Sequence, residues 1–176
     1  MATENKNLSS YDKNNLPNAE HFSFGIVVSD WNSHITHALR DGAIETLKDL
    51  GALEENISIM EVPGSFEFIF GSKLMCENPL IDAVIAIGSV IRGETAHFDY
   101  VCQGVTQGIK DLNIQEGVPV IFCVLTDDNE EQSIARSGGK HGNKGVEAAV
   151  AAVQMAQLNY DFGFPDFEWD DLPGLN

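Results

Sequence analysis

The sequence predicts one α/β domain, in which helices cover both faces of a four-stranded parallel β-sheet. Two observations support this prediction. First, residues 82–91 and 118–126 are continuous apolar runs, which are typical of parallel strands buried on both faces. Second, strand-like and helix-like segments alternate along the chain in the order βαβαβαβαα. With 176 residues, the chain is long enough for one domain with a sizeable core.

The first half of this alternation consists of two short strands, each followed by a helix. Residues 22–29 and 57–62 are apolar, β-rich runs that end at turn-forming residues. Between them, residues 33–50 carry an apolar stripe at helical spacing, with Ser33 as the expected N-cap. A second helix is expected over residues 65–76.

The second half contains the two apolar strands and three more helices, at residues 96–112, 130–137 and 145–157. A glycine-rich joint separates the last two helices. The final helix is apolar nearly all round, so it should be buried on more than one side. Contacts with other subunits are expected to supply the second side.

The ends of the chain differ in composition from this domain. Residues 1–20 are polar and are expected to form a flexible or loosely attached N-terminal arm. Residues 161–176 form an acidic, aromatic C-terminal tail. The domain itself is therefore expected to span residues 21–160.

Composition excludes several classes of function. The chain carries 27 acidic and 10 basic residues, a net charge of -17, which argues against binding to a nucleic-acid backbone. No apolar run approaches the roughly 20 residues of a membrane helix, and the polar N-terminus does not resemble a signal peptide. We therefore expect a soluble, cytoplasmic protein.

The three cysteines, Cys76, Cys102 and Cys123, are widely spaced and show no CxxC pattern. This pattern predicts buried free thiols in a reducing compartment, with no metal site.

In an open parallel sheet, ligands bind at the carboxyl ends of the strands. That rule selects the turns at residues 30–32, 63–67, 91–97 and 126–128. Each turn carries polar or aromatic side chains, although loops are commonly polar without binding anything.

The third of these turns is the most informative. The N–H groups of Gly93, Glu94 and Thr95 are expected to open a helix and so to bind an anion, although an ordinary N-cap explains the same residues. His97 follows and is suited to proton transfer near neutral pH, although a lone histidine is more often structural. Arg136 and Lys144, which flank the glycine-rich joint, are candidate counter-charges for the anion, although most Lys and Arg side chains are simply solvated.

Other turns offer weaker signals. Trp31 is a candidate for stacking on a flat heterocycle, or it caps the core. Ser65 and Glu67 open the second helix, where a cap and a carboxylate are stabilising regardless of function. Residues 137–145 look like a phosphate loop at a glance, but they follow a helix and lack the GxxxxGK[ST] spacing.

Taken together, the turns and strands contain five strings in a fixed order. They are Trp31-Asn32, VPGSFE (62–67), GSVIRGETAHFDYV (88–101), PVIFCVLT (119–126) and GNKGVEAA (142–149). This combination resembles the 6,7-dimethyl-8-ribityllumazine synthase family, over about residues 22–160. The resemblance implies a flavodoxin-like, three-layer α/β/α sandwich.

The family is an enzyme family of riboflavin biosynthesis. Its members condense 5-amino-6-(D-ribitylamino)uracil with 3,4-dihydroxy-2-butanone 4-phosphate, giving the lumazine, phosphate and water, without a metal or redox cofactor. The resemblance implies His97 as the proton-transfer residue, Arg136 as the counter-charge of the phosphate, and Trp31 as the aromatic that stacks on the pyrimidine. The other substrate-binding positions that it implies are Ser65, Phe66, Glu67, Val90, Ile91, Gly93, Glu94, Thr95, Phe122 and Lys144. Phe122, Arg136 and Lys144 resemble residues that the adjacent subunit contributes.

Members of this family form pentamers, and in many of them twelve pentamers close into an icosahedral shell. The joint at residues 138–144 is short and lacks the insertion that pentamer-only members often carry, so we expect the shell. Riboflavin synthase is a further candidate partner. The sequence departs from the family where Ile69 replaces a frequent proline. Trp31 stands where phenylalanine is equally common and is expected to alter affinity for flavin-like products.

Three other functions remain possible from the residues alone. A flavodoxin-like module that holds FMN would need a Ser/Thr-rich phosphate loop after the first strand, and residues 29–33 match it poorly. A signalling receiver domain would need an acidic cluster, whereas Asp127-Asp128 have only Asp30 as a partner. A shell protein without catalysis is disfavoured by His97 and Arg136.

Overall fold

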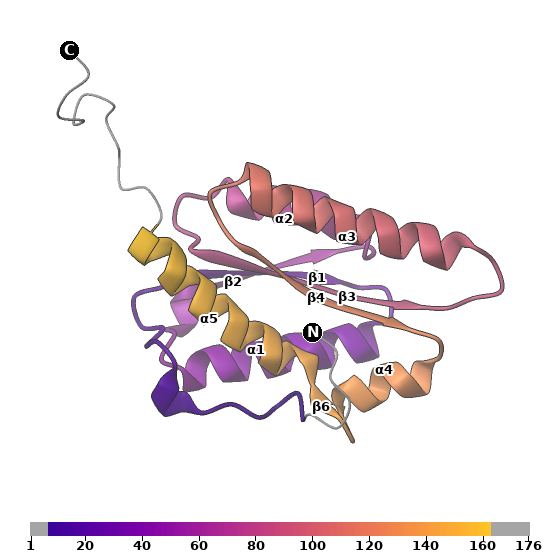
Figure 1. The fold of residues 1–176 in the computed structure, drawn as a ribbon, viewed down its shortest axis with the longest axis horizontal. Helices are drawn as coiled ribbons and strands as arrows, with labels where there is room; N and C mark the ends of the chain where they lie inside the picture. Colours follow the sequence, from indigo (N-terminus) through magenta and orange to yellow (C-terminus); the bar gives the residue numbers. More distant parts are fainter. Residues whose placement is uncertain (1–6, 163–176) are drawn as a thin grey trace, which may run out of the picture.

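The computed structural model describes residues 7–162, which form a four-stranded parallel sheet with helices on both faces (Figure 1). The strand order is β2-β1-β3-β4, and neighbouring strands pair in parallel. The strands are β1 (Phe24–Ser29), β2 (Ile57–Val62), β3 (Ala83–Ile91) and β4 (Val120–Asp127). The predicted fold class is therefore confirmed.

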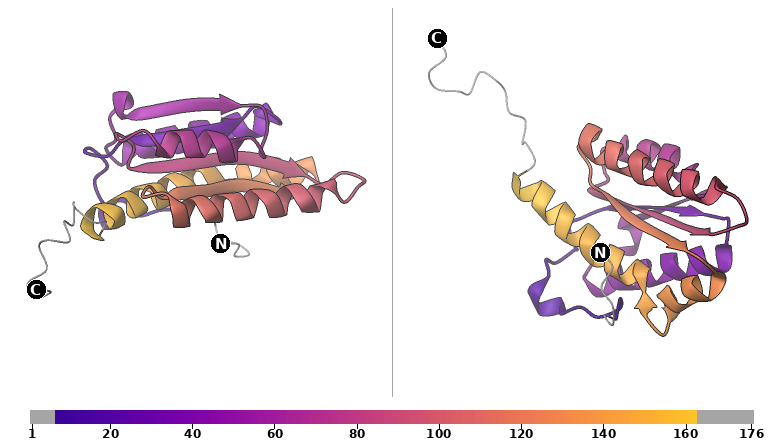
Figure 2. Two further views of the ribbon diagram at one scale, coloured as in Figure 1. Left: turned by 90° about the horizontal axis from the view of Figure 1, so that it is seen from above. Right: turned by 45° about the vertical axis from the view of Figure 1, so that its right-hand side comes forward.

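Each face of the sheet has its own helices. Helices α2 (Phe68–Cys76) and α3 (His97–Gln115) cover one face, and α1 (Ser33–Asp49), α4 (Glu130–Arg136) and α5 (Lys144–Phe162) cover the other (Figures 1 and 2). No helix of residues 7–162 is long and apolar enough to cross a membrane.

Alternation along the strands divides the core into two layers. Ile26 and Ile85 face α1 and α5, while Val27 and Val84, their sequence neighbours, face α2 and α3. Every residue of β1 is buried, because this strand has a neighbour on each side and helices on both faces.

All of the strands and helices expected from the sequence are present, but three details differ. The expected N-cap at Ser33 is wrong: Asn32 takes that position in a left-handed conformation, with φ 59°. The second helix begins at Phe68, three residues later than expected, and Glu67 is its N-cap. The glycine-rich joint contains an unexpected hairpin of two very short strands, β5 (Ser137–Gly139) and β6 (Gly142–Asn143).

The string GNKG, which closes this joint, fastens α5 to α1. The Asn143 amide donates to the Ala38 carbonyl at 2.9 Å, and its oxygen accepts from the Gly145 N–H at 2.8 Å. Gly145 lies so close to α1 that a Cβ there would stand 1.9 Å from the Leu39 carbonyl oxygen. Only glycine permits this approach of the two helices.

The described part of the N-terminal arm packs along the domain. Ala19 is fully buried, the Leu8 N–H donates to the His141 carbonyl, and the Tyr11 hydroxyl donates to Asp49 at 2.8 Å. That hydrogen bond holds the pKa of Asp49 below its usual value. The division of the chain at residues 20 and 160 stays a prediction. Helix α5 continues to Phe162, and the rest of the acidic tail, residues 163–176, lies outside the described residues.

The three cysteines are free thiols, as expected, but the expected burial is wrong for Cys102, which is only half-buried. Burial raises the pKa of Cys123 to about 12 and that of Cys76 to about 11, so both are protonated at neutral pH. Buried, protonated thiols of this kind are chemically inert.

Helix α5 is buried only on the side that faces the sheet and α1. Its small residues Ala149 and Ala152 are fully buried, whereas Leu158 and Tyr160 are exposed by 48% and 78%. Burial of the outer side by another subunit stays a prediction.

The contact between α1 and α5 generates a stability prediction. Gly145→Ala should lower the free energy of unfolding by about 3 kcal/mol, because the new methyl group overlaps the Leu39 backbone. Equilibrium unfolding in denaturant measures this loss. The control is Gly117→Ala, whose Cβ would have no atom within 4 Å. Equal effects of the two substitutions would contradict the proposed close approach.

Candidate active site

An open cleft of about 810 Å³ lies at the carboxyl ends of β1, β2 and β3. The turns that follow these three strands form its walls, which is where ligands bind in open parallel sheets. Nine of the predicted site residues line it: Trp31, Ser65, Phe66, Glu67, Val90, Ile91, Gly93, Thr95 and His97.

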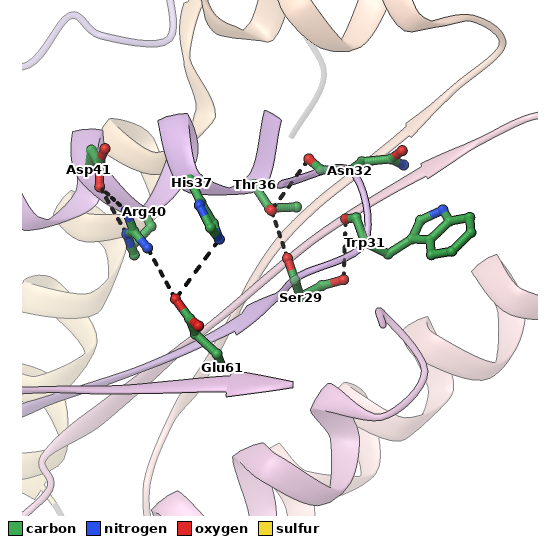
Figure 3. Close-up of polar contacts among 8 residues, drawn as sticks. All are labelled: Ser29, Trp31, Asn32, Thr36, His37, Arg40, Asp41 and Glu61. Carbon is green, nitrogen blue, oxygen red and sulfur yellow. Dashed lines mark hydrogen bonds and ion pairs between the residues drawn. The ribbon is translucent and has the colours of Figure 1, made fainter. Parts of the chain in front are cut away.

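The turn after β1 holds Trp31 away from the core. The Trp31 N–H donates to the Pro63 carbonyl, and the left-handed Asn32 donates its amide to the Ser89 carbonyl at 3.1 Å. Figure 3 shows the indole of Trp31 projecting away from α1, and the side chain is 72% exposed. An exposed aromatic face therefore stands at the cleft, with no stacking partner among residues 7–162.

The first turns of α1 also contact strands β1 and β2 of the sheet. The Thr36 hydroxyl donates to the Ser29 carbonyl at 2.6 Å, which closes the first turn of α1 onto the end of β1 (Figure 3). Further along α1, Arg40 and His37 reach Glu61 of β2 (Figure 3). These contacts fix α1, and with it the turn that carries Trp31.

The turn after β2 brings Ser65 and Glu67 to the cleft. Ser65 is buried against Gly88 of β3, where a Cβ would stand 2.6 Å from the Ser65 hydroxyl oxygen. Phe66 is 55% exposed and lies over Gly104 of α3. Because Gly88 and Gly104 have no side chain, they leave room for Ser65 and Phe66 of this turn.

The turn after β3 lies before α3 rather than within it. Helix α3 begins at His97 with Ala96 as N-cap, so the expectation that Gly93, Glu94 and Thr95 open the helix is wrong by one turn. Gly93, Thr95 and His97 line the cleft, and the positive end of the helix dipole faces this turn. Glu94 does not line the cleft.

Arg92 ties this turn to the one after β4. Its guanidinium contacts Asp128 at 2.9 Å and Asp99 at 3.3 Å, and lies 4.1 Å from the centre of the Phe98 ring. The hydrogen bond to Asp128 raises the pKa of Arg92 further. Sequence reasoning missed this role, although Arg92 stands directly before Gly93 in the VIRG string.

Three of the predicted residues lie away from the cleft. Phe122 is on the edge strand β4 and 36% exposed, and Arg136 ends α4, with Nε 4.0 Å from Asp127. Lys144 begins α5 and pairs with Glu147 at 2.5 Å. Among residues 7–162, none of the side chains that line the cleft is Lys or Arg. Within the described part of the chain, the cleft therefore offers a phosphate no Lys or Arg side chain.

Sequence reasoning also missed part of the lining. Phe98, Tyr100 and Val101 of α3 complete the wall beside His97. They belong to the string GSVIRGETAHFDYV, and the resemblance of that string to the family could have identified them. Within the described part of the chain, no group of three or more His, Cys, Asp or Glu side chains is placed to hold a metal ion.

The model of the 6,7-dimethyl-8-ribityllumazine synthase family matches residues 21–160. The chain belongs to this family. A lumazine synthase of Flavobacterium psychrophilum is 63% identical over 158 residues, which are 90% of this chain and 84% of the relative. Those of Christiangramia forsetii and Parabacteroides distasonis are 62% and 52% identical, over 93% and 90% of this chain and 98% and 99% of the relatives.

The strings that carry the family resemblance can be located in the structure. VPGSFE and GSVIRGETAHFDYV form two walls of the cleft, and Trp31-Asn32 forms its mouth. GNKGVEAA is the joint that fastens α5 to α1. The lumazine synthase strings therefore encode both the cleft and the helix packing behind it.

Proposed function

We propose that this chain is a lumazine synthase that condenses 5-amino-6-(D-ribitylamino)uracil with 3,4-dihydroxy-2-butanone 4-phosphate. The products are 6,7-dimethyl-8-ribityllumazine, phosphate and water, in the penultimate step of riboflavin biosynthesis. The observation that carries this proposal is the cleft, which gathers nine residues of the lumazine synthase strings at the strand ends.

The aromatic and polar side chains that line the cleft suit the ribitylaminouracil. Trp31 stacks its exposed indole on the flat pyrimidine, with Val90 and Ile91 as an apolar wall. Ser65 and Glu67 supply hydrogen-bond partners for the ring and the ribityl hydroxyls, and Phe66 covers them. A few polar groups in an apolar cleft fix the orientation of a ligand.

The phosphate of the second substrate lies at the turn formed by residues 93–95, of which Gly93 and Thr95 line the cleft, and this turn directly precedes the positive end of α3. Because no Lys or Arg of the described chain lines the cleft, the counter-charge comes from outside it. Arg136 of an adjacent subunit supplies it, together with Phe122 and Lys144 of that subunit. A guanidinium binds phosphate through two parallel hydrogen bonds and stabilises its charge as it leaves.

His97 lines the same cleft and transfers protons. The amine of the uracil attacks the ketone, a proton moves to the oxygen, and water leaves as the imine forms. Holding both reactive molecules side by side contributes a large share of the acceleration. These steps are proton transfers and an elimination, for which we infer no cofactor.

Self-association completes the site and covers apolar surface. Phe70 and Leu74 are exposed on α2, Phe66 is exposed in the turn before it, and Leu158 and Tyr160 are exposed on α5. Exposed apolar surface of this extent favours subunit contacts. We infer pentamers that close into a shell in the cytoplasm, with riboflavin synthase as a candidate partner.

A coupled optical assay tests the reaction. Purified protein is mixed with both substrates and a chelator, and the fluorescent lumazine is followed. We expect formation well above the uncatalysed rate. No acceleration from a folded, oligomeric sample would overturn the proposal and point to a binding or shell role.

His97→Ala should lower kcat by about a hundredfold, because proton transfer to the leaving groups is lost. Folding should be unaffected, since the side chain is exposed. Steady-state kinetics and thermal unfolding measure the two properties. His21→Ala, which removes an exposed histidine outside the cleft, is the control. An unchanged kcat removes His97 from the mechanism.

Arg136→Ala should raise KM for the butanone phosphate by about tenfold and leave KM for the uracil nearly unchanged, because only the phosphate loses its partner. Mixed oligomers then show which subunit supplies the arginine. Co-assembly of His97→Ala and Arg136→Ala chains restores about a quarter of the sites if each site spans two subunits. Failure to recover activity would place both residues in one chain's site.

The short joint between α4 and α5 predicts the larger assembly. Light scattering at neutral pH should report a particle of sixty subunits, because no insertion separates the hairpin from α5. A particle of pentamer size would show that the shell does not form.

A further inference from the structure

Arg136 has a single ion-pair partner among the described residues, the carboxylate of Asp127. Asp127 is the last residue of β4, and Arg136 is the last residue of α4. The shortest distance between them joins Arg136 Nε to Asp127 Oδ1 and is 4.0 Å. Nε is therefore the guanidinium nitrogen nearest to the carboxylate, and the contact is an ion pair rather than a hydrogen bond.

The Asp127 carboxylate is itself held firmly. Its side chain is only 9% exposed, and Oδ2 accepts a hydrogen bond from the fully buried Ser133 hydroxyl at 2.8 Å. The Asp127 carbonyl also accepts from the Arg92 N–H at 2.9 Å. A buried carboxylate is costly unless it is paired, so its position beside Arg136 needs an explanation.

The end of α4 that carries Arg136 is also fixed. Gly139 of the hairpin lies against it so closely that a Cβ would stand 2.8 Å from the Ala135 Cα. The His141 N–H donates to the Ala135 carbonyl at 2.8 Å. The backbone of Arg136 is thus held by the hairpin, and Asp127 is the carboxylate that its side chain approaches.

We propose that Asp127 is a positioning residue for Arg136. It holds the Nε edge of the guanidinium, so that both terminal amino groups face the phosphate of the four-carbon substrate in the neighbouring cleft. This inference rests on the proposed function, in which Arg136 binds that phosphate. An arginine oriented in advance loses less side-chain entropy when it binds an anion.

Asp127→Asn tests this role, because the amide keeps the shape and still accepts from Ser133 but loses the charge. We expect KM for the butanone phosphate to rise about tenfold, with kcat and KM for the uracil nearly unchanged. The matched control is Glu131→Gln, the same change on an exposed residue of α4. If Asp127 only repelled the phosphate, KM would fall instead, and the proposal would be wrong.

A second experiment, made in the Arg136→Ala protein, separates a positioning role of Asp127 from a general structural effect of its substitution. In the Arg136→Ala protein, Asp127→Asn should change KM for the phosphate substrate no further, since its effect passes through Arg136. An equal rise in both backgrounds would overturn the proposal. If Asp127→Asn does not fold, Ser133→Ala should raise the same KM about threefold by freeing the carboxylate. No change in that KM would likewise overturn the proposal.

A failure of the positioning role can be distinguished from a failure of the proposed function. An Arg136→Ala protein with normal KM for the butanone phosphate would remove Arg136 from the phosphate site. A raised KM in Arg136→Ala with an unchanged KM in Asp127→Asn would refute the positioning role alone.

Discussion

The parallel pairing of β1 with β2 on one side and β3 on the other is the constraint on which the site depends. In this register Ser29 lies beside Val62, and Val28 beside Ile87, so three strands end at the same edge of the sheet. The turns that follow are then forced together, although they are far apart in the sequence. The helices on both faces bury the strands and hold that register, since a slip by one residue would exchange the side chains that pack in the two core layers.

Charge is the second constraint, and it links catalysis to assembly. The cleft of the described chain has an exposed aromatic, glycine-rich turns and a histidine, but no Lys or Arg. Arg92, which directly precedes the cleft residue Gly93 in the sequence, forms ion pairs with Asp99 and Asp128. In the proposed function, the cation that binds the phosphate comes from another chain, as Arg136 at the end of α4, where it lies beside the buried Asp127. Under that proposal, an oligomer completes the site.

The sequence predicted the sheet and the walls of the cleft, because doubly buried strands are recognisable as apolar runs and their ends mark the site. It did not predict the left-handed Asn32, whose conformation is fixed by the distant Ser89 carbonyl. The hairpin at residues 137–143 was also missed, because Asn143 stabilises it through α1 rather than through local propensity. The partners of Arg92 and Arg136 are likewise tertiary, so no local pattern reveals them.

The most direct test of a shared site is a crystal structure of the oligomer with an unreactive analogue of the uracil and with inorganic phosphate. We expect the analogue to stack on Trp31, and the phosphate to lie at the turn of Gly93 and Thr95 within hydrogen-bonding distance of Arg136 from the adjacent subunit. A phosphate bound by Arg136 of the same chain, or an analogue outside the cleft, would contradict this account of the enzyme.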